Sequence, residues 1–376
     1  MLMEDRDYSI DFIRVIACYM IVLFHIHRWN LLILNFLPVS THLFVMITGY
    51  FIFNKNYNNK EILLKGIKKI IIPTIIFVVI TLNFSNWFLN KSSLLSCFNN
   101  FNIFLIFKNL PKILLLDFSG IDNYELYENL WYIKFYSMVL LLYPFFKTVC
   151  SKKTSSSYRK FIITCFIFNI LLRTLSGLGI VKIDSMLPFN SNDYIYLLLG
   201  YELSLSNKKL LNGSIKNVGL GIIFIIFGFI IQYSICRYLT ASNSSNLYYY
   251  MNSECIFSVF STVGMFILFG NIGKKLYKFK NIINWLSNKT FGIYLIHYII
   301  TFKLKKMNTY NIIEDKLGSS NLIFNEIIYA FLIFMICLII IVIIKNAKKA
   351  FTLTINKIKM TSKKVIGWIN SKKNLL

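Results

Sequence analysis

Three ionisable residues, Asp11, Arg14 and His25, stand within one apolar stretch near the N-terminus. Ionisable side chains inside a membrane helix are costly to bury and usually mark function. In an α-helix Asp11 and Arg14 share a face, because they are three residues apart, and each can neutralise the other. Arg14 and His25 fall on one stripe, about 16 Å apart along the axis. Histidine suits general-base catalysis near neutral pH, and a guanidinium suits phosphate or a developing oxyanion.

Each of these side chains also has a purely structural interpretation. Arg14 alone could extend to the inner membrane surface, and His25 alone could hydrogen-bond a neighbouring helix. Their occurrence on one stripe of one helix favours function. We therefore interpret His25 and Arg14 as catalytic residues, with Asp11 holding Arg14 in place.

The composition indicates which kind of element carries these residues. Of 376 residues, 56% are hydrophobic and 15% are charged, which is too little polar surface to cover a soluble core. Apolar stretches of about twenty residues, long enough to cross the hydrocarbon layer, recur along the chain. Because these stretches are continuous and do not alternate with polar residues, they predict an all-α integral membrane protein.

We predict about ten transmembrane helices. Their expected ranges are 9–27, 39–54, 70–86, 130–146, 161–179, 192–205, 217–236, 253–270, 287–302 and 322–344. The alternate loops 55–69, 147–160, 206–216 and 271–286, with the tail, carry most of the 41 Lys and Arg residues. The positive-inside rule places these segments and both termini in the cytoplasm. The net charge of +25 then reflects topology and contacts to anionic lipid, and we expect no nucleic-acid partner.

The chain is expected to form one transmembrane domain, residues 1–346, followed by a basic tail, residues 347–376. The tail mixes lysine with apolar residues, a composition that predicts an interfacial helix held by anionic lipid. The longest outer segment, 87–129, contains an amphipathic piece from Phe101 to Phe118 with Pro111 inside it. We expect this piece to lie on the outer face or to re-enter the membrane. The first apolar stretch lacks a small-residue cleavage site, so it is expected to be retained as a membrane helix.

Four further blocks follow the Arg14-x10-His25 spacing. They are Leu43-Phe-Val-Met-Ile-Thr-Gly49-Tyr, Lys65-Gly-Ile-Lys68-Lys69 running on to Pro73, Leu130-Trp131-Tyr132-Ile, and Thr290-Phe-Gly-Ile-Tyr294-Leu-Ile-His297. In this order, from about Tyr8 to Ile344, the blocks resemble the acyltransferase 3 family of membrane-bound acyltransferases. The chain departs from that pattern in three places. Thr48 replaces a serine, Asn129 replaces a histidine, and lysines stand where family members often carry Arg-x-x-Arg, which weakens a bidentate role there.

The resemblance implies an enzyme that takes an acyl group, most often acetyl, from a cytoplasmic acyl-coenzyme A. The group would pass to a hydroxyl of a cell-envelope glycan or glycolipid, across a plasma membrane of bacterial type. The implied catalytic residues are His25 and Arg14. The implied supporting residues are Asp11, Trp131, Tyr132, Tyr294 and His297, and the implied donor-binding residues are Arg14, Lys65, Lys68 and Lys69. Acetyl-coenzyme A would be a substrate, and we expect no bound cofactor and no metal.

Alternatives remain for several of these residues and for the function. Trp131 and Tyr132 also fit an interfacial aromatic belt, His297 fits a core hydrogen bond, and Gly49 fits helix packing. The three lysines obey the positive-inside rule whatever their chemistry. A transporter or exporter of a glycan intermediate would also have ten helices, but it predicts inverted repeats and charges on several helices. A non-catalytic scaffold would leave Arg14 and His25 unexplained.

Overall fold

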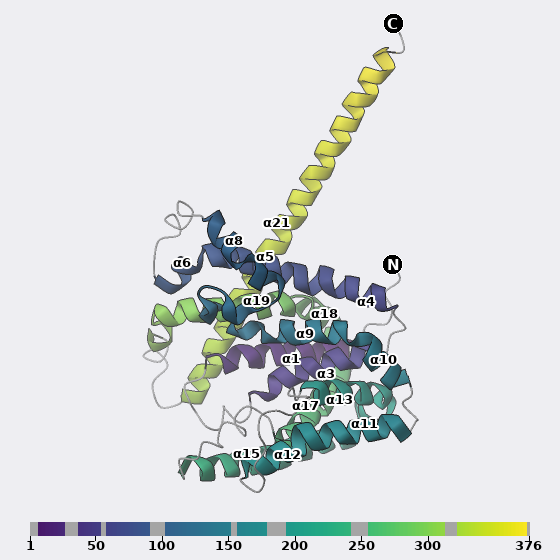
Figure 1. Cartoon of the computed structure of the whole chain (residues 1–376), viewed down its shortest axis with the longest axis vertical. Helices are drawn as coiled ribbons and strands as arrows, with labels where there is room; N and C mark the ends of the chain where they lie inside the picture. Colours follow the sequence, from purple (N-terminus) through teal and green to yellow (C-terminus); the bar gives the residue numbers. More distant parts are fainter. Residues whose placement is uncertain are drawn as a thin grey trace.

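The computed structural model describes residues 7–26, 37–53, 58–90, 102–151, 156–178, 193–241, 255–312 and 322–373. These residues form helices joined by turns, with no β-strand among them. The predicted all-α class is therefore confirmed. Figure 1 shows most of the helices packed side by side in one bundle, from which a single long helix projects toward the C-terminus.

A helix lies over each of the ten expected stretches. In chain order these helices are α1 (Tyr8–Phe24), α3 (Val39–Ile52), α5 (Ile72–Asn83), α9 (Trp131–Leu141), α11 (Ser156–Phe166) with α12 (Leu172–Gly177), α13 (Asp193–Leu205), α15 (Ile215–Ala241), α17 (Ile256–Lys275), α19 (Thr290–Lys306) and α21 (Leu322–Lys373). Among the described helices, three segments are long and apolar enough to cross a membrane unaided: Ile215–Ala241, Ile256–Lys275 and Ile323–Lys348. The count of ten spans and the orientation of the termini stay predictions.

Three of the expected stretches contain an irregular segment of helix backbone. Helix α9 and the following α10 (Tyr143–Ser151) together are apolar enough to form a fourth span, bent by 65° at their junction. Pro144 lies at the start of α10, where the N–H that proline lacks would have no helical acceptor. The helix over the third expected stretch begins earlier than expected, in α4 (Asn59–Gly66), and continues through a π-helical segment, η1 (Ile67–Ile71), into α5. Pro73 is the second residue of α5, close to η1, and proline disrupts the regular hydrogen-bond ladder of a helix. A second π-helical segment, η5 (Ile167–Leu171), joins α11 to α12.

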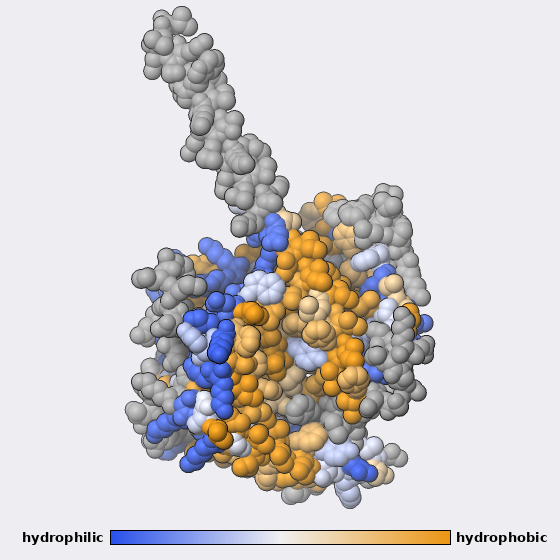
Figure 2. All heavy atoms as spheres, turned by 180° about the vertical axis from the view of Figure 1, so that it is seen from behind, coloured by the Kyte–Doolittle hydropathy of each residue, from blue (hydrophilic) through white to orange (hydrophobic). Residues whose placement is uncertain are grey.

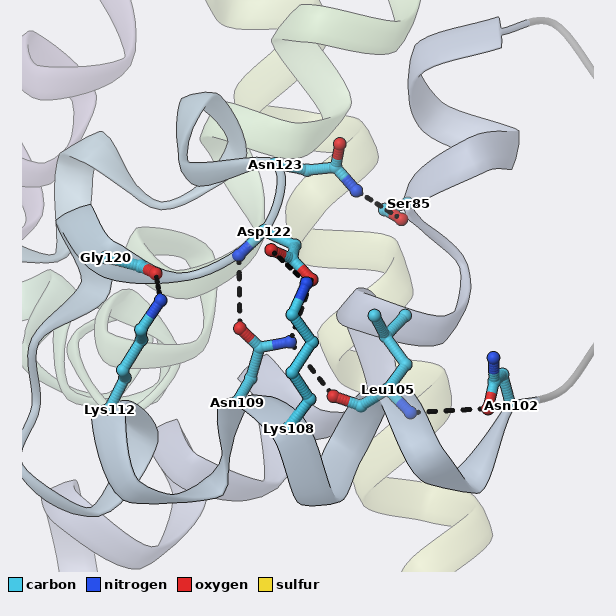
Figure 3. Close-up of polar contacts among 9 residues, drawn as sticks. All are labelled: Ser85, Asn102, Leu105, Lys108, Asn109, Lys112, Gly120, Asp122 and Asn123. Carbon is cyan, nitrogen blue, oxygen red and sulfur yellow. Dashed lines mark hydrogen bonds and ion pairs between the residues drawn. The ribbon is translucent and has the colours of Figure 1, made fainter.

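The outer segment contains the expected amphipathic helix, α8 (Ile103–Leu114), with Pro111 inside it. The loop that follows is tied back onto α8 (Figure 3). Lys108 Nζ lies 2.9 Å from a carboxylate oxygen of Asp122, Asn109 donates to the same carboxylate at 3.2 Å, and Lys112 donates to the Gly120 carbonyl. The hydrogen bonds from Lys108 and Asn109 lower the pKa of the Asp122 carboxyl. The contact is therefore expected to persist at all but strongly acidic pH.

Short helical turns then carry the chain from α8 to α9. They are η2 (Phe118–Gly120), η3 (Tyr124–Leu126) and η4 (Glu128–Leu130). Asn123 adopts a left-handed conformation with φ of 61°, which asparagine tolerates better than most residues. Its amide donates to Ser85 Oγ at 2.9 Å, at the start of α6 (Ser85–Asn90). Because η4 leads directly into Trp131 and Tyr132, these hydrogen bonds help to fix the position of the segment that carries both aromatic residues.

The basic tail is helical, but it is not a separate element. Helix α21 runs without a break from Leu322 to Lys373, through the expected boundary at 346. In Figure 1 its C-terminal part leaves the bundle as a straight rod. The expected placement of the tail on a lipid surface stays a prediction.

Helix α1 is the central element of the bundle. It packs against α3, α17, α19, α21 and the short helix α18 (Lys280–Ser287), which follows the turn η6 (Tyr277–Phe279). Another short helix, α14 (Asn207–Leu210), connects α13 to α15. Figure 2 shows apolar side chains spread over a broad face of the molecule, with hydrophilic ones gathered along one edge. Exposed isoleucines of α15 and α21, such as Ile223 and Ile343, suit contact with lipid chains.

Two glycines hold α3 and α13 in backbone contact. A Cβ on Gly49 would lie 1.8 Å from the Leu197 carbonyl oxygen, and a Cβ on Gly200 would lie 2.0 Å from that of Met46. Such distances leave no room for a methyl group unless the helices separate. Gly49, part of one family-like block, therefore serves helix packing, as small residues commonly do in membrane proteins.

Gly49→Ala and Gly200→Ala are each expected to destabilise the protein by at least about 1–3 kcal/mol, because neither carbonyl can move without its helix. The measurement is thermal unfolding of the purified variants. Gly219→Ala is the matched control, since nothing lies within 4 Å of a Cβ at that position. A Gly49→Ala protein as stable as Gly219→Ala would contradict the packing of α3 on α13.

Candidate active site

The predicted pair at the start of α1 is present. The guanidinium Nη1 of Arg14 lies 2.9 Å from Asp11 Oδ1 and donates to Ser287 Oγ at 3.1 Å. The Ser287 hydroxyl in turn donates to Asp11 Oδ1 at 2.6 Å. Asp11 is buried, with a side chain 1% exposed, whereas that of Arg14 is 25% exposed. The three residues form a closed polar triangle that anchors α1 to the end of α18 and leaves part of the guanidinium accessible.

Helix α3 also contacts this centre. The Arg14 guanidinium carbon lies 5.6 Å from the centroid of the Phe51 ring, within cation–π range. The aromatic face limits the directions in which the guanidinium can turn. Arg14 is thus held in a defined orientation, as an anion-binding arginine must be to use its planar donors.

His25 lies at the other end of α1, where it is the C-terminal capping residue. Its ring centroid is 5.2 Å from that of His297 and 4.8 Å from that of Tyr298, both on α19. His25 and His297 therefore lie side by side in the folded chain, although the two residues are far apart in sequence. Their helices place two imidazole rings side by side at one end of the bundle.

The geometry around His297 indicates its tautomer. His297 is fully buried, and its Nδ1 lies 2.7 Å from the Tyr294 carbonyl oxygen. A carbonyl can only accept, so Nδ1 carries the proton and donates it. In the neutral ring Nε2 is then an acceptor, and it has no hydrogen-bond partner among the described residues. His297 thus offers a buried proton acceptor beside His25.

His25 also lines a small pocket with three more of the predicted residues: Trp131, Tyr132 and Tyr294. Asn129, Thr41, Ile21 and Phe44 complete its lining. The volume open to water in this pocket is about 20 Å³, which is enough for about one ordered water molecule. Trp131 is 40% exposed, so the pocket lies against the surface at that residue. A substrate hydroxyl could take the place of such a water beside His25.

Hydrogen bonds between helices fix the aromatic wall of this pocket. The Tyr132 hydroxyl lies 2.6 Å from Thr48 Oγ1, on α3. Asn129 donates to the Tyr294 carbonyl at 3.1 Å, and the Tyr294 hydroxyl donates to the Asn129 carbonyl. Thr48 and Asn129 are two of the places where the sequence departs from the family pattern. The Thr48 hydrogen bond nevertheless joins α3 to the segment that carries Trp131 and Tyr132, and the Asn129 hydrogen bonds join α19 to it.

Tyr298, beside His25, and its partner Glu128 are not identifiable from the sequence. The Tyr298 hydroxyl donates to Glu128 Oε2 at 2.9 Å, which holds the Tyr298 ring at the edge of the His25 ring. Glu128 belongs to η4 and Tyr298 to α19, 170 residues apart. No motif or spacing links them, so only the folded structure reveals the contact.

The predicted donor lysines lie elsewhere. Lys65 pairs with Glu61 at 2.6 Å, one turn away on α4, and Lys68 and Lys69 are exposed on η1. These segments pack mainly on α9, whereas α1 packs on α3, α17, α18, α19 and α21. The structure thus brings together two groups of predicted residues, one around Arg14 and one around His25, and leaves the three lysines apart from both. In the described ranges no three His, Cys, Asp or Glu side chains are close enough to hold a metal ion.

The described helices form a bundle with one polar centre at each end of α1, one around Arg14 and one around His25. This arrangement is that of a membrane protein with a histidine site inside its bundle. The family model of the acyltransferase domain, acyltransferase 3, matches residues 7–345 and so includes both centres. The chain belongs to this family and is a membrane acyltransferase. No curated protein and no solved structure matches it.

Proposed function

We propose that the protein transfers an acyl group, in the first instance acetyl, from cytoplasmic acyl-coenzyme A to a hydroxyl of a cell-envelope glycan or glycolipid. The enzyme would act in the plasma membrane of a bacterium, with its basic tail on anionic lipid. The observation that carries the proposal is the position of His25, in a pocket beside the buried imidazole of His297. A histidine there can accept a proton from a hydroxyl that enters the pocket.

In the proposed reaction His25 takes the proton of the acceptor hydroxyl as its oxygen attacks the thioester carbonyl. A C–O bond forms, the C–S bond breaks, and the thiolate of coenzyme A leaves with the proton that His25 returns. Tyr298, held by Glu128, and His297, held by the Tyr294 carbonyl, would keep the imidazole oriented during both proton transfers. The aromatic wall made by Trp131 and Tyr132 suits the apolar faces of a sugar ring.

Arg14 would bind the donor from the other end of α1. Eleven residues of helix separate it from His25, about 16 Å along the axis. A guanidinium pairs well with phosphate, and coenzyme A carries its phosphates at the end of the molecule remote from the thioester. Arg14 binding phosphate and His25 acting near the thioester are therefore compatible with one extended donor lying along α1.

Lys65, Lys68 and Lys69 are proposed to attract the anionic donor without fixing its position. Replacing all three with glutamine should raise the donor KM and leave kcat nearly unchanged, because exposed charges mainly assist binding. Single replacements should have little effect, since each exposed contact contributes at most about 1 kcal/mol. Steady-state kinetics with varied acyl-coenzyme A provide the measurement. An unchanged donor KM in the triple variant would leave these lysines as topology signals only.

The proposed function is tested by mass spectrometry of cell-envelope glycans from cells with and without the gene. Glycans from cells that carry the gene should contain an acyl ester that disappears on deletion. The ester should return with the wild-type gene and not with one encoding His25→Ala. Identical glycans in all these strains would contradict the proposed acceptor class.

A further inference from the structure

The turn between α18 and α19 gathers three cationic side chains. The residues concerned are Ser287, the last residue of α18, and Asn288 and Lys289, which form the turn. Ser287 accepts a hydrogen bond from Arg14, and the Asn288 carbonyl accepts one from Lys345 Nζ at 2.6 Å. The cations therefore reach this turn from α1, from α21 and from the turn itself.

Carboxylates of the described residues do not balance the two lysine charges at this turn. Asp11 lies here, but it is already bonded to Arg14 and Ser287. Neither Lys289 nor Lys345 forms an ion pair with a carboxylate in the described part of the chain. The Lys289 ammonium instead lies 5.0 Å from the centroid of the Trp285 ring.

Like charges held near each other repel, and the two lysines do so here. Lys289 directly follows Asn288, whose carbonyl oxygen holds the Lys345 ammonium, and partial burial and then the charge of Lys289 both disfavour the charged form of Lys345. The Asn288 carbonyl nevertheless keeps Lys345 in place by accepting its hydrogen bond. An anion bound at the turn would remove this repulsion and would meet ammonium and guanidinium donors together.

We propose that Lys289 and Lys345, together with Arg14, form a binding site for phosphate groups. On the proposed function, on which this assignment of the ligand rests, these are the phosphates of the acyl donor. The site extends the donor-binding surface from Arg14 to Lys289, which directly precedes α19, and to Lys345, which follows the apolar part of α21. Two point charges beside one planar guanidinium suit a ligand with more than one phosphate.

The site is tested by titrating free coenzyme A into the purified full-length protein in phosphatidylcholine nanodiscs. The double variant Lys289→Gln/Lys345→Gln is expected to bind coenzyme A at least about tenfold more weakly, because two charged hydrogen bonds are lost. The matched control is Lys278→Gln/Lys280→Gln, which removes two charges from the neighbouring η6–α18 surface. Equal affinities in the double variant and the wild type, with both proteins folded, would overturn the proposal.

A second arm separates donor phosphate from lipid phosphate. The melting temperature of each protein is compared in nanodiscs with and without phosphatidylglycerol. If Lys289→Gln/Lys345→Gln loses only the stabilisation by phosphatidylglycerol and keeps its affinity for coenzyme A, the site binds lipid headgroups and the donor assignment is wrong. Weaker coenzyme A binding with unchanged lipid stabilisation supports the donor site.

The failure of this site and the failure of the proposed function have different signatures. Normal acyl transfer with an unchanged donor KM in the double variant would reject the site and leave the function standing. Lysine-dependent binding of coenzyme A by a protein that forms no acylated product would uphold the site and reject the function.

Discussion

Replacing His25 with alanine is expected to lower kcat for acyl transfer by about 10²–10⁴-fold, the usual contribution of a general base. The affinity for coenzyme A should be unchanged, because His25 lies at the end of α1 remote from Arg14. Expression and thermal stability should also be close to wild type, since His25 is only partly buried and follows the last helical residue of α1. Single-turnover kinetics and donor titration on the same preparation provide the two measurements.

His297→Gln is the matched comparison for this prediction. Glutamine can still donate to the Tyr294 carbonyl, but it has no imidazole to present to His25. A moderate loss of kcat, smaller than that of His25→Ala, would identify His297 as a positioning residue. A shifted pH profile in the His297 variant would distinguish this role from a purely structural one. A well-expressed His25→Ala protein with a near wild-type rate would show that the general base is another residue.

Replacing Arg14 with alanine is expected to cause two separate losses. The first is stability, because the buried Asp11 carboxylate would lose its guanidinium partner, and breaking a buried ion pair costs about 3–5 kcal/mol. The second is donor binding, because the guanidinium would no longer meet phosphate. The Arg14→Ala protein should therefore be obtained in low yield and should be inactive. Arg14→Lys keeps the charge and should fold better while remaining weakly active.

The double variant Asp11→Asn/Arg14→Gln separates these two losses. It removes both charges, so no unpaired carboxylate is left and the folded yield should recover relative to Arg14→Ala. Donor binding should stay as weak as in Arg14→Ala. Recovery of coenzyme A affinity together with the folded yield would contradict a direct role for Arg14 in donor binding.

Features set by local spacing could be predicted from the sequence. The apolar stretches gave all ten helix positions, and the three-residue spacing gave the Asp11–Arg14 pair. The family-like blocks led to Tyr132, Tyr294 and His297, of which the two tyrosines share a pocket with His25 and His297 lies beside it. The blocks that carry these three residues point to the site because they lie on α9 and α19, whose side chains lie beside His25.

Features that depend on packing between distant segments could not be predicted. Ser287 contacts Arg14 across 273 residues of sequence, and a serine at the end of a short helix carries no signal of that partner. The same is true of Glu128 with Tyr298 and of Lys345 with Asn288. One family-like block alone predicts that Lys65, Lys68 and Lys69 bind the donor. The segments that carry them, α4 and η1, pack against α9. Because the chain contains many lysines, the sequence does not show which basic residues lie close together. Only the folded structure shows this.

The central claim is that this protein forms an acyl ester by means of His25. The most direct measurement uses purified protein in proteoliposomes, given acetyl-coenzyme A labelled in the acetyl group and glycans extracted from the cell envelope. The wild-type protein should transfer label to the glycan fraction and release free coenzyme A, whereas His25→Ala, equally folded, should do neither. Glycan movement across the membrane without any labelled product, or equal labelling by the two proteins, would contradict the account.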